Sequence, residues 1–184
     1  MSEEEKMLAG ELYDANYNKD LFDLRTKAKE LCYDYNNLRP SDLNGKKELM
    51  RKILQKPIGD FIIEPNFYCD YGFNIEIGKN FYSNHNLVVL DANKVKFGDN
   101  VFIGPNCGFY TSGHPLDYET RNKGLEYAKP ITVGDNVWIG GNVCVMPGVN
   151  IGSNVVIGAG SVVTKDIPSN SVAVGSPSKV IRGL

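Results

Sequence analysis

Two histidines are the side chains of this sequence best suited to proton transfer near neutral pH, because an unperturbed imidazole titrates close to that range. His114 lies in the segment 110–115 (YTSGHP), among small and polar residues. There it could take the proton from an attacking hydroxyl as a general base, or it could be a solvated loop side chain. His85 lies in NHN at 84–86, and we interpret it as structural or adjacent to a substrate.

The four cysteines form no metal or redox motif. They are far apart in the sequence, and no Cys-x-x-Cys pair is present: Cys32, Cys69, Cys107 and Cys144. Pairs at that spacing are typical of zinc sites and of thioredoxin-like chemistry. We therefore expect no bound metal and interpret these side chains as buried or idle thiols.

Composition argues against several classes of partner. The chain has 184 residues, a formal net charge of -2 and 42% hydrophobic residues, so one domain with a sizeable core is expected. Neither a nucleic-acid surface nor a polybasic membrane patch is indicated. The N-terminus is acidic rather than secretory in type, and the longest apolar runs are too short to cross a bilayer. A cytoplasmic protein with a small-molecule partner is expected.

The elements that must position these residues begin with helices. Ser2 and Glu5 have the spacing of a capping box, which predicts a short first helix. Apolar residues then recur at steps of three and four over about 20–37, which predicts an amphipathic second helix. A third helix is expected over about 41–56. Pro57 ends the helical region because proline lacks the backbone donor of a helix interior.

From about residue 75 the sequence repeats every six residues. The clearest anchors are β-branched: Val133, Ile139, Val145, Ile151, Ile157 and Val163. Four residues after each comes a second small or apolar side chain: Val137, Val143, Val149, Val155, Ser161 and Ile167. Three residues after each comes a residue that tolerates positive φ: Asn136, Asn142, Gly148, Asn154, Gly160 and Asp166. Straight segments that alternate with regular turns stack into a solenoid, so the sequence predicts a parallel β-helix.

The repeat stops between Phe109 and Ile131, where the chain becomes polar and irregular. An extruded loop is expected over about 110–130, and loops on rigid scaffolds are favoured places for chemistry. The predicted organisation is a helical N-terminal segment, 1–57, followed by the β-helix, 58–184.

Three stretches carry a family resemblance: NVWIGG at 136–141, GAGSVVTKDIP at 158–168 and EKMLAGELY at 5–13. The first two resemble the hexapeptide acetyltransferases. The third narrows the resemblance to the maltose and galactoside O-acetyltransferases, including the nodulation acetyltransferase branch. The resemblance implies a mainly β fold, a left-handed parallel β-helix of hexapeptide repeats with a short N-terminal helical subdomain. It also implies a homotrimer with active sites between subunits.

The resemblance further implies a site for a sugar acceptor. His114 matches the catalytic base, and Asn84 matches a catalytic side chain whose amide positions the reacting hydroxyl. The acceptor-binding positions that it implies are Asp14, Arg25, Asp70, Tyr82, Asn84 and Asp91. Carboxylates and guanidinium groups suit arrays of hydroxyls, but Asp14, Arg25 and Asp91 could equally serve no ligand.

Acetyl-CoA is the donor that the resemblance implies, with no metal. The cofactor-binding positions are Trp138, Gly141, Ala159, Thr164, Lys165, Lys179 and Arg182. Gly141 and Ala159 match positions beside the thioester and pantetheine, where the N–H of Gly141 could stabilise an oxyanion. The last four match the nucleotide end, where cations suit phosphates. Trp138 either packs on the pantetheine or lies at the trimer interface.

The predicted activity is acetyl transfer from acetyl-CoA to a sugar hydroxyl by direct attack. Two alternatives stay open: an acetyltransferase for xenobiotics such as antibiotics on the same solenoid, and a non-catalytic solenoid for assembly or binding. The γ-class carbonic anhydrases share the solenoid but bind zinc through three histidines. This chain has two, so a zinc site of that kind is not expected.

Overall fold

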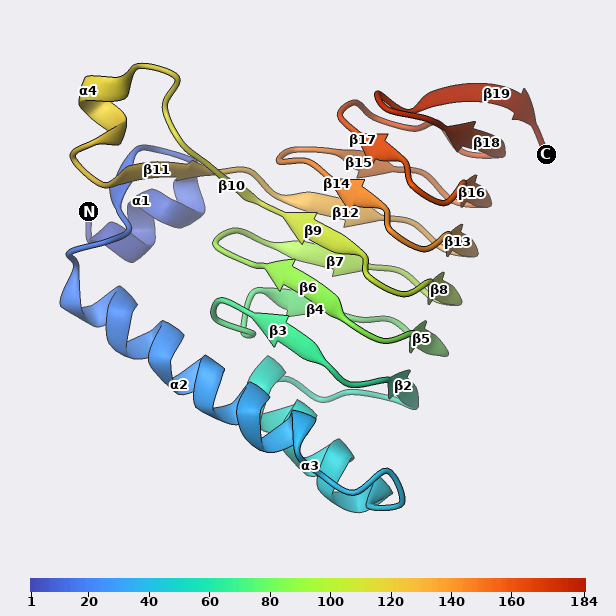
Figure 1. Cartoon of the computed structure of the whole chain (residues 1–184), viewed down its shortest axis with the longest axis horizontal. Helices are drawn as coiled ribbons and strands as arrows, with labels where there is room; N and C mark the ends of the chain where they lie inside the picture. Colours follow the sequence, from blue (N-terminus) through green and yellow to red (C-terminus); the bar gives the residue numbers. More distant parts are fainter.

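A solenoid with three flat faces forms most of the molecule (Figure 1), and the computed structural model describes all 184 residues. The first face contains β2 (Phe61–Ile63), β5 (Phe81–Ser83), β8 (Val101–Ile103), β13 (Val137–Ile139), β16 (Val155–Ile157) and β18 (Ser171–Val174). The second contains β3 (Phe67–Cys69), β6 (Leu87–Leu90), β9 (Gly108–Tyr110), β14 (Cys144–Val145) and β17 (Val162–Val163). The third contains β4 (Ile75–Glu76), β7 (Val95–Phe97), β12 (Ile131–Val133) and β15 (Asn150–Ile151). Neighbouring strands of each face pair in parallel, which confirms the predicted β-helix.

The six-residue repeat works as predicted, with one exception. All twelve anchor and second positions are buried, and the φ angle is positive at Asn136, Asn142, Gly148, Asn154 and Gly160. The prediction for Asp166 is wrong. Val145 pairs with Val163, 18 residues on, but Ile151 pairs with Ile167, only 16 residues on, so the last coil is two residues shorter at the corner between the second and third faces, and φ is not positive at Asp166. The carboxylate of Asp166 instead accepts a hydrogen bond from the N–H of Asn150 at 2.7 Å.

Three helices precede the solenoid: α1 (Glu3–Ala9), α2 (Lys19–Asn36) and α3 (Leu43–Leu54). The capping box of Ser2 and Glu5 is present at the start of α1. One face of α2 and α3 packs on the first coils, where Cys32, Tyr35 and Met50 join the same buried cluster as the strands. None of the helices combines the length and apolar character needed to cross a membrane.

The extruded segment between β9 and β12 is ordered. It contains β10 (Ser112–Gly113), the short helix α4 (Tyr118–Arg121) and β11 (Leu125–Ala128). β11 pairs antiparallel with β10 on one side and with β1 (Tyr13–Asp14) on the other. The segment therefore projects beyond the solenoid next to α1 (Figure 1) and ties the N-terminus to the repeat. At the other end, β19 (Lys179–Gly183) folds back antiparallel on β18.

Candidate active site

A cavity of about 290 Å³, which we call the His114 cavity, lies where the extruded segment meets α2 and the end of β3. Its lining is Tyr13, Ala15, Asn16, Arg25, Lys29, Asp70, Tyr71, Leu90, Ala92, Ser112, His114 and Glu126. Three residues predicted from the sequence meet in it: Arg25, Asp70 and His114. An imidazole, carboxylates and a guanidinium group thus share one small polar space.

His114 faces a carboxylate that sequence reasoning missed. Nε2 of His114 lies 3.6 Å from Oε1 of Glu126, and the His114 side chain is 51% exposed. Oε2 of Glu126 accepts a hydrogen bond from the hydroxyl of Tyr13 at 3.0 Å. Burial raises the pKa of that phenol well above its usual value, so Tyr13 stays a donor. The pair is placed by the β1–β11 register, because Tyr13 lies opposite Glu126.

Arg25 and Asp70 form the opposite wall. Arg25 donates to the hydroxyl of Tyr71 at 2.8 Å and to the carbonyl of Ala15 at 2.6 Å, which fixes the guanidinium group. Burial raises the pKa of the Asp70 carboxyl, and the positive charge of Arg25 opposes that shift. The wall therefore offers a carboxylate and a cation that form no ion pair with each other, and the cation is held by neighbouring groups.

Asp91 and Asp14 do not line the cavity. Asp91 is fully buried, and its carboxylate accepts hydrogen bonds from the N–H groups of Asp70, Tyr71 and Asn74. Burial raises the pKa of Asp91 to about 6, against the effect of the Tyr71 N–H. Asp91 thus holds the turn that presents Asp70. Oδ1 of Asp14 accepts from the N–H groups two and three residues further along, at 3.2 and 2.9 Å, and closes a local turn.

A second group of predicted residues lies on the corner between the first and second faces. Asn84 follows β5, Gly141 follows β13 and Ala159 follows β16. Backbone hydrogen bonds join successive coils along this corner, among them Gly160 N–H to Gly141 carbonyl at 2.9 Å. His85 belongs to the same corner, where its Nδ1 donates to the carbonyl of Pro65, so it has a structural partner.

The outward side chains beside this corner form a row on the first face. Tyr82 pairs with Phe102, which pairs with Trp138, so three aromatic rings project from successive coils. Phe102 and Trp138 are 41% and 59% exposed. The predicted acceptor residue Tyr82 and the predicted cofactor residue Trp138 therefore lie on one face of the solenoid.

The predicted nucleotide-end residues do not gather at one place within the chain. Thr164 and Lys165 follow β17, at the corner between the second and third faces, whereas Lys179 and Arg182 lie on β19 beside the first face. All four side chains are exposed.

Comparisons with known proteins identify the family. Residues 6–59 match the maltose acetyltransferase hexapeptide capping motif, and residues 130–165 match the hexapeptide repeat of succinyl-transferase. A putative acetyltransferase of Saccharomyces cerevisiae is 61% identical, over 98% of this chain and 92% of that protein. The galactoside O-acetyltransferase of Escherichia coli is 44% identical, over 98% of this chain and 88% of its own. This chain belongs to the maltose/galactoside O-acetyltransferase family.

Solved structures agree with this assignment. A maltose O-acetyltransferase from Clostridium difficile superposes with a TM-score of 0.97 at 46% identity, covering 100% of this chain and 98% of that one. A galactoside acetyltransferase in complex with coenzyme A superposes with a TM-score of 0.91 at 43% identity, covering 100% of this chain and 91% of that one. A Vibrio cholerae hexapeptide-repeat acetyltransferase complexed with acetyl-coenzyme A also has a TM-score of 0.91, at 38% identity, and the match covers 100% of this chain and 99% of that one. The chain is therefore an enzyme, an acetyltransferase.

In this acetyltransferase the predicted site residues divide into two groups. His114 and Asp70 lie at the edge where the second face ends, and Asn84 and Gly141 lie at the edge where it begins. The strands of the second face separate the two edges. No three or more His, Cys, Asp or Glu side chains gather in a group that could hold a metal ion.

Proposed function

We propose that this acetyltransferase moves an acetyl group from acetyl-CoA to a hydroxyl of a sugar, with His114 as general base. The observation that carries the proposal is the His114 cavity, where an imidazole next to a carboxylate shares a small space with Arg25 and Asp70. Charged side chains of both signs are suited to hold the hydroxyls of a sugar ring. Related structures in complex with coenzyme A and acetyl-coenzyme A support the choice of donor.

The proposed reaction is direct transfer. The imidazole of His114 takes the proton of the sugar hydroxyl as its oxygen attacks the thioester carbonyl. The negative charge of Glu126 stabilises the imidazolium that forms, and the N–H of Gly141 is suited to donate to the developing oxyanion. When the intermediate collapses, the C–S bond breaks and the departing sulfur takes the proton from His114. The products are the sugar ester and free CoA.

We also propose a homotrimer of left-handed solenoids, in which each active site combines two subunits. The division of the site residues between opposite edges of the second face supports this assembly, because a neighbouring chain could bring Asn84 and Gly141 to His114. The exposed rings of Phe102 and Trp138 supply apolar area for such a contact. A cytoplasmic location is part of the proposal, since all four cysteines are free thiols.

The test is to measure release of the CoA thiol from acetyl-CoA over a panel of glucosides, galactosides, chitooligosaccharides and chloramphenicol. Transfer to a sugar that is lost in His114→Ala supports the proposal. Transfer to chloramphenicol alone would favour a xenobiotic acetyltransferase, and no transfer to any acceptor would refute the proposed sugar acetylation. Undiminished transfer by His114→Ala would refute the role of the histidine.

A further inference from the structure

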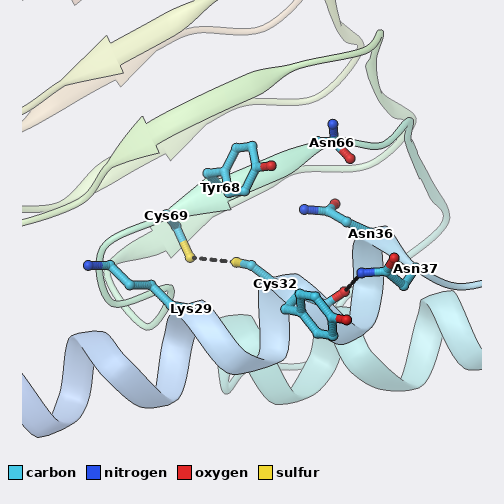
Figure 2. Close-up of a pocket in the computed structure, with 8 residues that line it drawn as sticks. Lys29, Cys32, Asn36, Asn37, Asn66, Tyr68 and Cys69 are labelled. Carbon is cyan, nitrogen blue, oxygen red and sulfur yellow. Dashed lines mark hydrogen bonds between the residues drawn. The ribbon is translucent and has the colours of Figure 1, made fainter.

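A second cavity lies next to the His114 cavity and has no role in the reaction described above. Its volume is about 560 Å³, and it lies between α2 and β3 (Figure 2). Its lining is Lys29, Cys32, Tyr33, Asn36, Asn37, Asn66, Tyr68 and Cys69. Lys29 lines both cavities, and Cys69 directly precedes Asp70 of the His114 cavity. We call this space the Tyr68 cavity; a ligand held in the His114 cavity could extend into it.

The base of the Tyr68 cavity is fixed by contacts within the chain. Asn36 donates to the carbonyl of Phe67 at 3.0 Å and accepts from the N–H of Phe67 at 2.8 Å, which joins α2 to β3. The sulfur atoms of Cys32 and Cys69 lie 3.7 Å apart below it, and both side chains are buried (Figure 2). These residues shape the cavity, and their polar groups already have partners.

Other residues of the lining, from both α2 and the β3 side, offer polar groups with no partner in the chain. The hydroxyls of Tyr33 and Tyr68 and the amide of Asn66 form no hydrogen bond with other residues, and the two rings are 69% and 49% exposed. Lys29 forms no ion pair, and it is the only charged side chain of the lining. The free surface is therefore made of neutral donors and acceptors, two flat rings and one cation, the ammonium group of Lys29.

We propose that the Tyr68 cavity is a subsite for a second sugar unit of the acceptor, with the acetylated unit in the His114 cavity. A sugar ring has hydroxyls at its edge and C–H groups on its faces, which match the amide and phenol groups and the tyrosine rings respectively. A purely apolar substituent would bury these polar groups without partners, at a cost in free energy. The volume is within the usual range of small-molecule sites. This inference rests on the proposed sugar acetylation.

The test compares a methyl hexoside, the matching disaccharide and the matching phenyl hexoside as acceptors, in the wild type and in Tyr33→Ala and Tyr68→Ala. We expect each substitution to lower kcat/KM for the disaccharide by about tenfold and to leave that for the methyl hexoside unchanged, since each tyrosine would stack on and hydrogen-bond to the second sugar ring alone. Tyr33→Phe should lose less than Tyr33→Ala. The control is Phe22→Ala, an exposed aromatic residue of α2 outside both cavities.

Several results would overturn the subsite. Equal losses for both sugars would indicate an effect on the fold or on the His114 cavity, and no loss for the disaccharide would leave the cavity without a role in binding. A loss confined to the phenyl hexoside would indicate an apolar occupant. In each of these cases acetylation of the methyl hexoside by the wild type shows that the proposed function still stands. Absence of transfer to all three acceptors would overturn both proposals.

Discussion

The carboxylate of Glu126 lies between His114 and Tyr13: one oxygen is 3.6 Å from Nε2 of the histidine, and the other accepts the tyrosine hydroxyl at 3.0 Å. Glu126 comes from β11 and Tyr13 from β1, so two segments far apart in the sequence orient one side chain towards the imidazole. A carboxylate in this position is suited to stabilise the positive charge that the imidazole would gain on taking the hydroxyl proton in the proposed reaction.

Removing that negative charge should therefore slow the reaction through His114 alone. A unit charge pair at this distance near the surface interacts by about 1 kcal/mol in a water-like dielectric, so Glu126→Gln should lower kcat by about fivefold to tenfold. His114→Ala should lower kcat by about 10²–10⁴-fold. Steady-state assays of CoA release on both single variants and the double variant test the coupling. If Glu126→Gln lowers kcat by the same factor in the His114→Ala variant as in the wild type, Glu126 does not act through the histidine.

The division of the site between two edges of the second face predicts complementation between inactive subunits. His114→Ala and Asn84→Ala should each be nearly inactive alone. In the proposed trimer, co-expression would give mixed assemblies in which about one quarter of the sites pair an intact His114 with an intact Asn84 from a neighbour, and activity should return to about that fraction of wild type. The control is a mixture of the separately expressed proteins assayed before subunits exchange. Co-expressed chains with no recovered activity would place both residues of a site in one subunit.

The repeat made most of the solenoid predictable, because each buried anchor and each turn residue reports its own place in a coil. Asp166 shows the limit: the residue type tolerates positive φ, but the last coil is two residues shorter at this corner, and Asp166 lies beside Asn150 instead. The resemblance, rather than the repeat, supplied Arg25 and Asp70, which the fold brings together with His114. Glu126 could not be found in this way, because nothing in its polar surroundings separates it from other loop charges. Only the pairing of β11 with β1 singles it out.

At the corner between the first and second faces, a methyl side chain should be tolerated much less well at Gly140 than at Gly141. A Cβ on Gly140 would lie 2.6 Å from the backbone nitrogen of Ala159, so the coils would have to separate. On the adjacent Gly141 a Cβ would meet Pro105 at 3.2 Å, a tight but adjustable contact with a ring carbon. Gly140→Ala should therefore destabilise the protein by about 1–3 kcal/mol, and Gly141→Ala by less. Chemical denaturation of the two variants tests this order. Equal stabilities would show that the coil spacing adjusts freely.

The buried carboxyl of Asp91 predicts a pH-dependent contribution to stability. Its pKa is about 6 in the fold against an ordinary 3.8, so the folded state binds this proton more tightly than the unfolded chain does. The contribution is complete below about pH 4 and is lost as the pH rises through 6. At about 1.4 kcal/mol per pKa unit its full size is about 3 kcal/mol.

Asp91→Asn should remove this dependence while leaving other titrations in place. The free energy of unfolding of the wild type minus that of the variant should therefore decrease by up to about 3 kcal/mol between pH 4 and pH 7. Urea titrations across that range measure the difference. Asp34→Asn is the matched control for the loss of one carboxyl, because Asp34 is exposed on α2 and its side chain forms no hydrogen bond. An increase with pH for Asp91→Asn would mean that the three N–H donors outweigh burial and hold the carboxylate charged in the fold.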